Sequence, residues 1–228
     1  MRNMKSLPTK TILAFNGSPV KESSTDLITR EILSGAAEEG FESEHIHLND
    51  LDILPCQSCG ESPGGKLCFF EDDLFPHLHK FADCDIAVVS SPVYFDTVSA
   101  QTKLMVDRCN CFKPLTGYET GDFRFADLNL KPRLGIIVLV GGEREKFEHA
   151  LAVVKGFFIW TGVRLFDQII YAHGEYTKGA VKDNQELLQK AREIGRKAAR
   201  SAIPKSVSYT HLRAHETVLD LVCRLLLE

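Results

Sequence analysis

The sequence lacks the features that would direct it to a nucleic acid, a membrane or an export route. Its 228 residues contain no block of basic side chains and carry a formal net charge of -4 at pH 7, which disfavours binding to nucleic acids or anionic lipids. No apolar run approaches the about 20 residues of a membrane-spanning helix, and the first ten residues have no apolar core of a secretion signal. These absences predict a cytoplasmic protein with no nucleic-acid or membrane partner.

Two common nucleotide-binding fingerprints are also missing. No Gly-Lys-Ser/Thr sequence closes a glycine-rich loop, and Gly17 stands alone where a dinucleotide site needs three spaced glycines. Instead, an apolar run is followed by Asn-Gly-Ser-Pro and then by Ser23, Ser24 and Thr25 at the start of a helical pattern. Such a turn offers backbone N–H groups and the positive end of a helix dipole. We expect it to hold a phosphate monoester, with Ser24 or Thr25 as N-cap; an ordinary capped turn is the alternative.

Strand and helix patterns alternate along the chain. The predicted strands are residues 12–15, 45–48, 86–89, 134–140 and 163–171. The predicted helices are residues 26–40, 72–81, 99–109, 146–160 and 181–199. This alternation implies right-handed crossovers in a doubly wound, parallel α/β sheet, with ligands at the carboxyl ends of the strands. The single tryptophan, Trp160, is expected in the core or at a subunit interface.

Several of these stretches together resemble the NAD(P)H-dependent FMN reductase family. They are Gly17-Ser18-Pro19 with Ser23-Ser24-Thr25, Ser91-Pro92-Val93-Tyr94-Phe95 with residues 99–103 and Asp107-Arg108, and Gly141-Gly142. The resemblance covers most of residues 10–200. It implies a flavodoxin-like three-layer sandwich with a five-stranded parallel sheet in the order 2-1-3-4-5, FMN as cofactor, NAD(P)H as co-substrate and a homodimer.

The resemblance also implies roles for individual residues. In the family the first motif holds the FMN phosphate, the Ser-Pro-x-Tyr-Phe loop borders the isoalloxazine, and the glycine-bearing loop after the fourth strand approaches the flavin from another side. Val20, Ser23 and Ser24 stand where the commoner family form has arginine, glycine and asparagine. The implied phosphate residues are Ser18, Pro19, Ser23, Ser24 and Thr25, the implied ring contacts are Pro92, Val93, Tyr94 and Phe95, and the implied backbone contacts are Gly141 and Gly142.

The function implied is an FMN-dependent oxidoreductase that passes reducing equivalents from NAD(P)H through the flavin to a small acceptor such as a quinone, a flavin or a metal ion. Because hydride transfer is the chemistry of the cofactor, no catalytic acid or base is required of the protein. The alternative is a flavodoxin-like electron carrier, or an iron-sulfur flavoprotein, without efficient NAD(P)H oxidation.

A glycine-rich segment with Cys56, Cys59 and Cys68 resembles the compact cysteine motif of iron-sulfur flavoproteins, a branch of the same family. That branch has a further cysteine about where Ser62 stands. Because a four-iron cluster normally needs four thiolates, we predict FMN without a cluster. The alternatives are zinc bound by the three cysteines with a histidine, or thiols that pack inward.

The other cysteines of the domain, Cys84, Cys109 and Cys111, are predicted to be buried thiols. A fold that brings one of them beside the glycine-rich segment would restore a fourth ligand. Asp72 or Asp73 is expected to cap the helix that follows the segment.

The end of the chain is interpreted separately. Residues 207–217 and 221–228 resemble the two constant blocks of a translated sequencing adapter, with three arbitrary residues between them. We therefore expect one FMN-binding reductase domain over residues 1–206 and a non-native tail over residues 207–228. An amphipathic C-terminal helix is the alternative.

Overall fold

The computed structural model describes residues 9–59, 67–117, 119–126, 128–174 and 177–202. The tail predicted to be adapter-derived, residues 207–228, lies outside the described residues. Within these ranges, none of the helices combines the length and hydropathy that a membrane-spanning segment needs.

The centre of the fold is a parallel sheet whose strands follow the order β2-β1-β3-β7-β8. Its strands are β1 (Thr11–Asn16), β2 (Glu42–His47), β3 (Ile86–Tyr94), β7 (Arg133–Gly142) and β8 (Val163–His173). This confirms the predicted order of five parallel strands. The structure adds β4 (Thr97–Val98), which folds back antiparallel on the end of β3.

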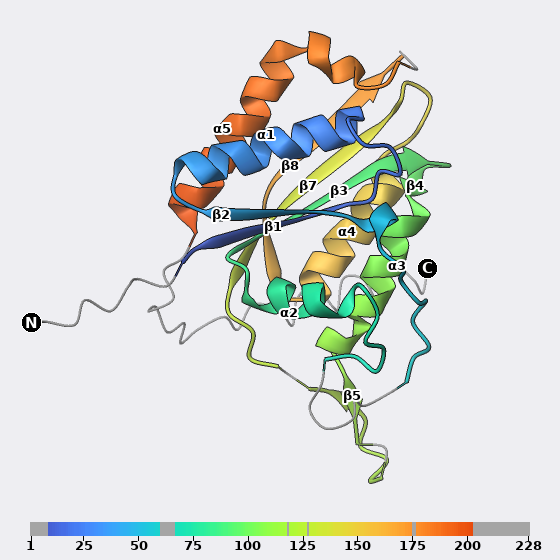
Figure 1. Ribbon diagram of the computed structural model, residues 1–228. Helices are drawn as coiled ribbons and strands as arrows, with labels where there is room; N and C mark the ends of the chain where they lie inside the picture. Colours follow the sequence, from blue (N-terminus) through green and yellow to red (C-terminus); the bar gives the residue numbers. More distant parts are fainter. Residues whose placement is uncertain (1–8, 60–66, 118, 127, 175–176, 203–228) are drawn as a thin grey trace, which may run out of the picture.

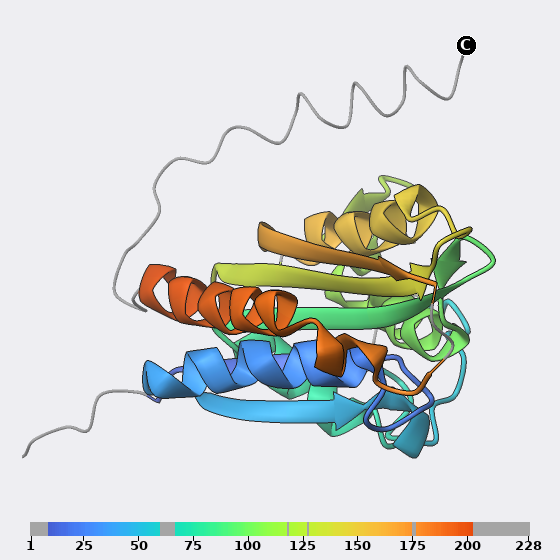
Figure 2. The same cartoon turned by 90° about the horizontal axis from the view of Figure 1, so that it is seen from above.

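Helices cover both faces of the sheet and complete three layers (Figures 1 and 2). One face carries α1 (Ser24–Glu38) and α5 (Gln185–Ser201), and the other carries α2 (Phe75–Asp83), α3 (Ala100–Arg108) and α4 (Glu148–Trp160). Alternate strand residues supply the two cores: Ile12 and Ala14 face α1, whereas Leu13 and Phe15 face α2. The central strands are therefore apolar on both faces, as the continuous runs predict.

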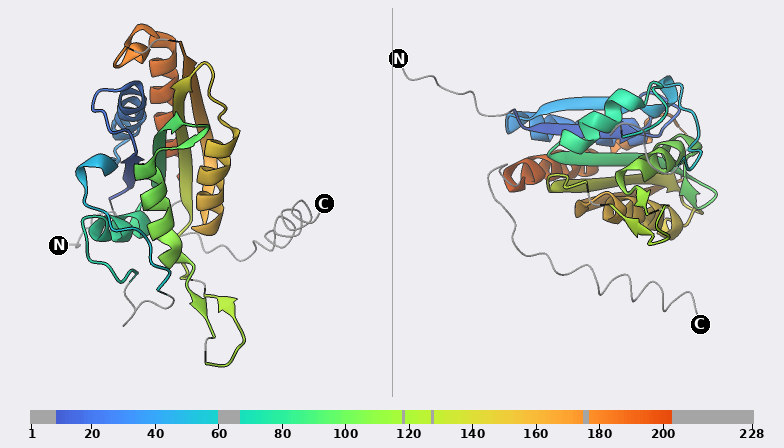
Figure 3. Two further views of the ribbon diagram at one scale, coloured as in Figure 1. Left: turned by 90° about the vertical axis from the view of Figure 1, so that its right-hand side faces the viewer. Right: turned by 90° about the horizontal axis from the view of Figure 1, so that it is seen from below.

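Short elements connect these layers. They are the 3₁₀ turns η1 (Leu48–Asp50), η3 (Cys109–Phe112) and η4 (Ala180–Asp183), and the hairpin strands β5 (Leu115–Thr116) and β6 (Arg124–Phe125). The β5–β6 hairpin projects away from the sheet (Figures 1 and 3). On it, the Phe125 ring contacts Trp160, with 5.3 Å between ring centroids. Trp160 is 46% exposed, so its placement in the core is wrong and the interface alternative is left.

Two predicted helix starts are wrong. The N-cap of α1 is Ser23, whose Oγ accepts the N–H of Asp26, rather than Ser24 or Thr25. Helix α2 begins at Phe75 with no side-chain cap. The carboxylates of Asp72 and Asp73 instead accept the backbone N–H groups of Leu54 and Asp52, because the chain just before α2 lies beside residues 52–54.

Candidate functional site

The loop after β1 packs directly against the loop after β3. The N–H of Gly17 donates to the carbonyl of Ser90 at 2.8 Å, and Ser99 Oγ donates to the carbonyl of Gly17 at 2.8 Å. A Cβ added to Gly17 would lie 1.8 Å from Thr102 Oγ1. Only glycine fits this contact, so the predicted phosphate loop is fixed against the start of α3.

Inside this loop, hydroxyl and amide groups gather behind the N-terminus of α1. The Ser18 and Ser23 hydroxyls lie 2.9 Å apart, and the N–H of Ser18 donates to Asn16 Oδ1 at 2.9 Å. Glu22 has a φ of 58°, and its N–H donates to Asp26 Oδ2 at 2.6 Å. The side chains of Asn16 and Asp26 thus hold the backbone of the loop from within.

The first turn of α1 keeps donors that the helix itself does not use. Helix geometry gives the N–H groups of Ser24 and Thr25 no intrahelical acceptor, whereas the Asp26 N–H is capped by Ser23. The hydroxyl of Ser24 accepts the N–H of Val181 at 3.2 Å and so ties α1 to η4. Thr25 is 2% exposed. An anion here would meet two backbone N–H groups and the hydroxyls of Ser18 and Ser23.

The loop after β3 presents an aromatic turn. Pro92 and Val93 are buried in β3, whereas Tyr94 is 46% and Phe95 100% exposed. Burial of part of the ring raises the pKa of Tyr94. Phe95 and Asp96 have φ values of 51° and 62°, as in a type I′ hairpin turn that normally selects asparagine and glycine. An exposed phenylalanine held in this conformation costs about 1–3 kcal/mol, which favours a functional role.

The loop after β7 meets this aromatic turn. A Cβ added to Gly141 would lie 3.3 Å from Val93 Cβ and 3.0 Å from the Phe147 ring, and the Lys146 N–H donates to Asp96 Oδ1 at 2.8 Å. A Cβ added to Gly142 would lie 2.4 Å from a carboxylate oxygen of Glu145. The loop after β1 contacts the loop after β3, and the loop after β3 contacts the loop after β7. The structure therefore brings the three groups of residues that the sequence analysis singled out to one edge of the sheet.

The segment that contains Cys56, Cys59 and Cys68, the cysteine segment, is held by a buried arginine. The side chain of Arg108 is 1% exposed and forms an ion pair with Asp72. It also donates to the carbonyls of Leu54 at 2.8 Å and Phe70 at 3.3 Å, and to Cys68 Sγ at 3.2 Å. Asp72 is therefore not a helix cap but the counter-ion of Arg108.

The remaining cysteines differ in their distance from this segment. Cys84 and Cys109 are buried, as predicted, whereas Cys111 is only partly buried. Burial, and next the neighbouring Cys68, raise the pKa of Cys111 to about 12, and Cys56 adds to the shift. The fold thus brings Cys111 near two cysteines of the segment. In the described part of the chain, however, no three cysteine sulfurs lie within 4.8 Å of one another, so these thiols do not form a preassembled zinc site.

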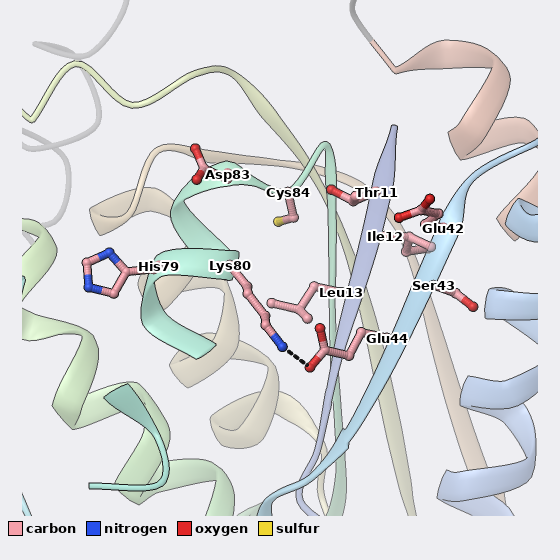
Figure 4. Close-up of a pocket in the computed structure, with 10 residues that line it drawn as sticks. All are labelled: Thr11, Ile12, Leu13, Glu42, Ser43, Glu44, His79, Lys80, Asp83 and Cys84. Carbon is pink, nitrogen blue, oxygen red and sulfur yellow. Dashed lines mark hydrogen bonds and ion pairs between the residues drawn. The ribbon is translucent and has the colours of Figure 1, made fainter. Parts of the chain in front are cut away.

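The pocket in Figure 4 lies elsewhere. It has a volume of about 380 Å³ and is lined at the amino ends of the strands by Thr11 of β1 and Glu42 of β2. Lys80 of α2 forms an ion pair with Glu44 across it at 2.7 Å. Because Gly17 and Gly141 lie at the opposite, carboxyl ends of β1 and β7, this pocket is not part of the candidate site.

The fold and the candidate site define a flavodoxin-like α/β protein with a hydroxyl-rich turn after its first strand and an aromatic turn after its third. The sequence profile described as "NADPH-dependent FMN reductase" matches residues 11–177, and the chain belongs to this family. The family uses FMN as cofactor and NAD(P)H as co-substrate. The chain is therefore an FMN-dependent oxidoreductase, which confirms the predicted class of enzyme.

Similar proteins agree with this assignment. An iron-sulfur flavoprotein of Methanocaldococcus jannaschii is 33% identical over 196 residues, 82% of this chain and 95% of that protein. A putative NAD(P)H-dependent FMN-containing oxidoreductase of Bacillus subtilis is 25% identical over 193 residues, 82% of this chain and 98% of that protein. The solved structure of a flavone reductase superimposes with a TM-score of 0.62 at 23% identity, covering 84% of this chain and 62% of that one. This last similarity shows the fold.

The residues present fit FMN. Paired hydroxyls stand at the N-terminus of α1, where the first turn keeps unused backbone N–H groups for a phosphate, and the exposed aromatic turn after β3 lies against the loop after β7. Sequence reasoning missed Asn16 and Asp26, which support the loop from behind. An amide side chain at the end of a strand and an acid in the first turn of the next helix are the signals that could have identified them.

Proposed function

We propose that the protein oxidises NAD(P)H at a bound FMN and passes the electrons to a small-molecule acceptor such as a quinone, a flavin or a metal ion. One observation carries the proposal: the loops after β1, β3 and β7 meet at one edge of the sheet. There, the Ser18 and Ser23 hydroxyls stand 2.9 Å apart on one side, and Phe95 is fully exposed on the other. A phosphate and a flat ring need these two kinds of surface.

The phosphate end is assigned to the loop from Ser18 and Pro19 to Thr25. Ser18, Ser23 and Thr25 offer hydroxyls, and Ser24 and Thr25 also offer backbone N–H groups at the positive end of α1. The hydroxyl of Ser24 is engaged with Val181, so its contribution comes from the backbone. Hydrogen bonds to a charged phosphate contribute about 1.5–3 kcal/mol each.

The ring is assigned to Pro92, Val93, Tyr94 and Phe95 on one side and to the backbone of Gly141 and Gly142 on the other. Bound FMN supplies hydride acceptance and electron delivery. The chain's own residues bind the phosphate, border the ring and leave one face open for nicotinamide and then for the acceptor. No titrating side chain of the chain is needed for either half of the reaction.

The test is the visible spectrum of the purified protein before and after anaerobic addition of NADPH, followed by steady-state NADPH oxidation with a quinone or ferricyanide. We expect a yellow protein that bleaches with NADPH and turns over with the acceptor. A yellow protein that neither bleaches with NADPH or NADH nor turns over would favour an electron carrier.

The second candidate is an iron-sulfur flavoprotein, the name carried by the relative from Methanocaldococcus jannaschii. The observation in its favour is the position of Cys111 near Cys68 and Cys56; burial is the main cause of the raised pKa of Cys111, and these two cysteines add to it. We keep the proposal of FMN without a cluster, because Ser62 replaces one thiol of the motif. Protein prepared anaerobically with iron and sulfide should show flavin absorption only. Stoichiometric iron and sulfide that disappear in Cys111→Ser would establish the second candidate.

A cytoplasmic homodimer is proposed as the working form. Phe125, Ile159 and Trp160 leave apolar surface exposed where the β5–β6 hairpin reaches the end of α4, at 54%, 54% and 46%. Sedimentation equilibrium should give twice the chain mass, and Trp160→Asp should shift the protein towards the monomer if this surface is the interface.

A further inference from the structure

A cluster of metal-ligating side chains lies beside the phosphate loop. His45 and His47 are two residues apart on β2 and therefore point to the same face of the sheet. In the pairing of β1 with β2, His47 lies opposite Asn16, which leads into the loop. Asp26 comes from the first turn of α1. The Asp26 side chain is 0% exposed, and those of His45 and His47 are 16% and 14% exposed.

The ligand atoms have nearly the spacing that a tetrahedral ion requires. Asp26 Oδ1 lies 3.4 Å from His47 Nε2 and 3.6 Å from His45 Nε2. All three ligand atoms lie within 4.8 Å of one another. A tetrahedral zinc ion with ligand distances of about 2.0–2.1 Å separates its ligand atoms by about 3.3 Å. The two distances from Asp26 Oδ1 are therefore within about 0.3 Å of the spacing in a tetrahedral site.

The surroundings orient the carboxylate for this role. Asp26 Oδ2 accepts the N–H of Glu22 at 2.6 Å and the guanidinium of Arg30 at 2.9 Å, so Oδ1 is left facing the two imidazoles. Such outer partners fix ligating carboxylates in metal sites. Asn16 Nδ2, 3.2 Å from His45 Nε2 and 3.4 Å from Asp26 Oδ1, is the partner that an ion would displace.

The histidines are placed to act as ligands. Nε2 of each ring faces Asp26 Oδ1, and both side chains are mostly buried. Among the described residues, Nδ1 of His47 is buried and has no hydrogen-bond partner. His47 therefore directs one ring nitrogen, Nε2, at Asp26 and has no partner within the described residues for the other.

We propose that Asp26, His45 and His47 bind one divalent transition-metal ion, with Zn²⁺ as the best match to two imidazoles and a carboxylate, and water as the fourth ligand. The ion would join the edge strand β2 to the first turn of α1. Through the contact of Asp26 with the Glu22 N–H, it would stiffen the phosphate loop. This binding site does not depend on the proposed function.

The test is a calorimetric titration with Zn²⁺ of the purified, tag-free holoprotein after dialysis against a chelator. We expect one ion per chain with micromolar or tighter affinity, and at least a tenfold loss of affinity in both His45→Gln and His47→Gln. His149→Gln, an exposed histidine at the start of α4, is the matched control and should bind like the parent. Equal affinity in the parent and the two β2 variants would overturn the proposal.

X-ray absorption at the zinc edge of the loaded parent protein keeps the test independent of how the variants fold. Nitrogen and oxygen ligands at about 2.0–2.1 Å, including imidazole scattering, support the site, whereas sulfur at about 2.3 Å would place the ion on cysteines and reject it. Binding seen only at millimolar Zn²⁺ would also reject it. A protein that binds zinc at this cluster but fails to oxidise NAD(P)H would leave the inference standing and refute the proposed function.

Discussion

Replacement of two hydroxyls in the phosphate loop tests the assignment of the FMN phosphate. Ser18 and Thr25 are 3% and 2% exposed and flank the N-terminus of α1. Each is expected to donate to a phosphate dianion, a type of bond that contributes about 1.5–3 kcal/mol. Loss of two such bonds would lower the binding free energy of FMN by at least about 3 kcal/mol. This corresponds to a roughly 150-fold loss of affinity, since about 1.4 kcal/mol is a factor of ten.

The protein contacts of Ser18 reduce this figure. Its Oγ donates to the carbonyl of Val20 at 3.0 Å and lies 2.9 Å from Ser23 Oγ, so a bond to phosphate replaces an existing bond. We therefore expect at least a tenfold weaker FMN affinity in the double variant Ser18→Ala, Thr25→Val. Valine keeps the volume of threonine inside the fold and removes only the donor.

The assay is quenching of flavin fluorescence with FMN and with riboflavin, which lacks the phosphate. The loss should appear for FMN and not for riboflavin. Ser43→Ala, an exposed hydroxyl on β2 away from the loop, is the control and should change neither affinity. Equal binding of FMN and riboflavin by the parent protein, or an equal loss of both in the double variant, would refute the phosphate assignment.

Three further predictions follow from other parts of the chain. Phe95→Asn should raise the free energy of unfolding in urea by about 1 kcal/mol, because asparagine tolerates the positive φ, and should lower kcat/KM for NADPH; an unchanged kcat/KM would remove Phe95 from the site. Asp72→Ala should lower the free energy of unfolding by about 3 kcal/mol, because it leaves Arg108 buried without its counter-ion. Burial acts to raise the pKa of Asp72, but hydrogen bonds from Arg108 and the Leu54 N–H outweigh it and lower the pKa, so this stabilisation should be present above about pH 4 and be lost as acid titrates the folded carboxylate. Truncation after Ser206 should shift Tm by less than about 5 °C, roughly 1 kcal/mol in a domain of this size; a larger fall would make residues 207–228 part of the fold.

The sheet could be predicted because its central strands carry one signal along their whole length. Residues 86–89 and 134–140 are continuously apolar, and the structure buries them on both faces in β3 and β7. The edge strand gave a weaker signal, since β2 reads Glu-Ser-Glu-His-Ile-His and has one buried residue, Ile46. The prediction of residues 45–48 therefore found the strand but placed it three residues late.

Side-chain partners from distant segments could not be predicted. No residue near Asp72 in the sequence indicates that its partner is Arg108, which lies 36 residues further on. The carboxylate that was expected to cap α2 forms an ion pair with this arginine instead. The cluster of Asp26, His45 and His47 is of the same kind, because it exists only where β2 lies beside the loop before α1. The N-cap was missed by one residue because three consecutive hydroxyls offer equal local signals; in the structure Ser23 caps the helix, and Ser24 Oγ accepts the Val181 N–H instead.

The buried guanidinium of Arg108 has a consequence for how the family can diversify. It bonds to Leu54 at one end of the cysteine segment and to Phe70 and Asp72 at the other, so the segment leaves and rejoins the fold at a single anchor. Cys56 and Cys59, which lie between these ends and are not buried, can therefore vary without disturbing the sheet. Cys68 is buried and accepts a hydrogen bond from the guanidinium, so its exchange is coupled to that of the arginine.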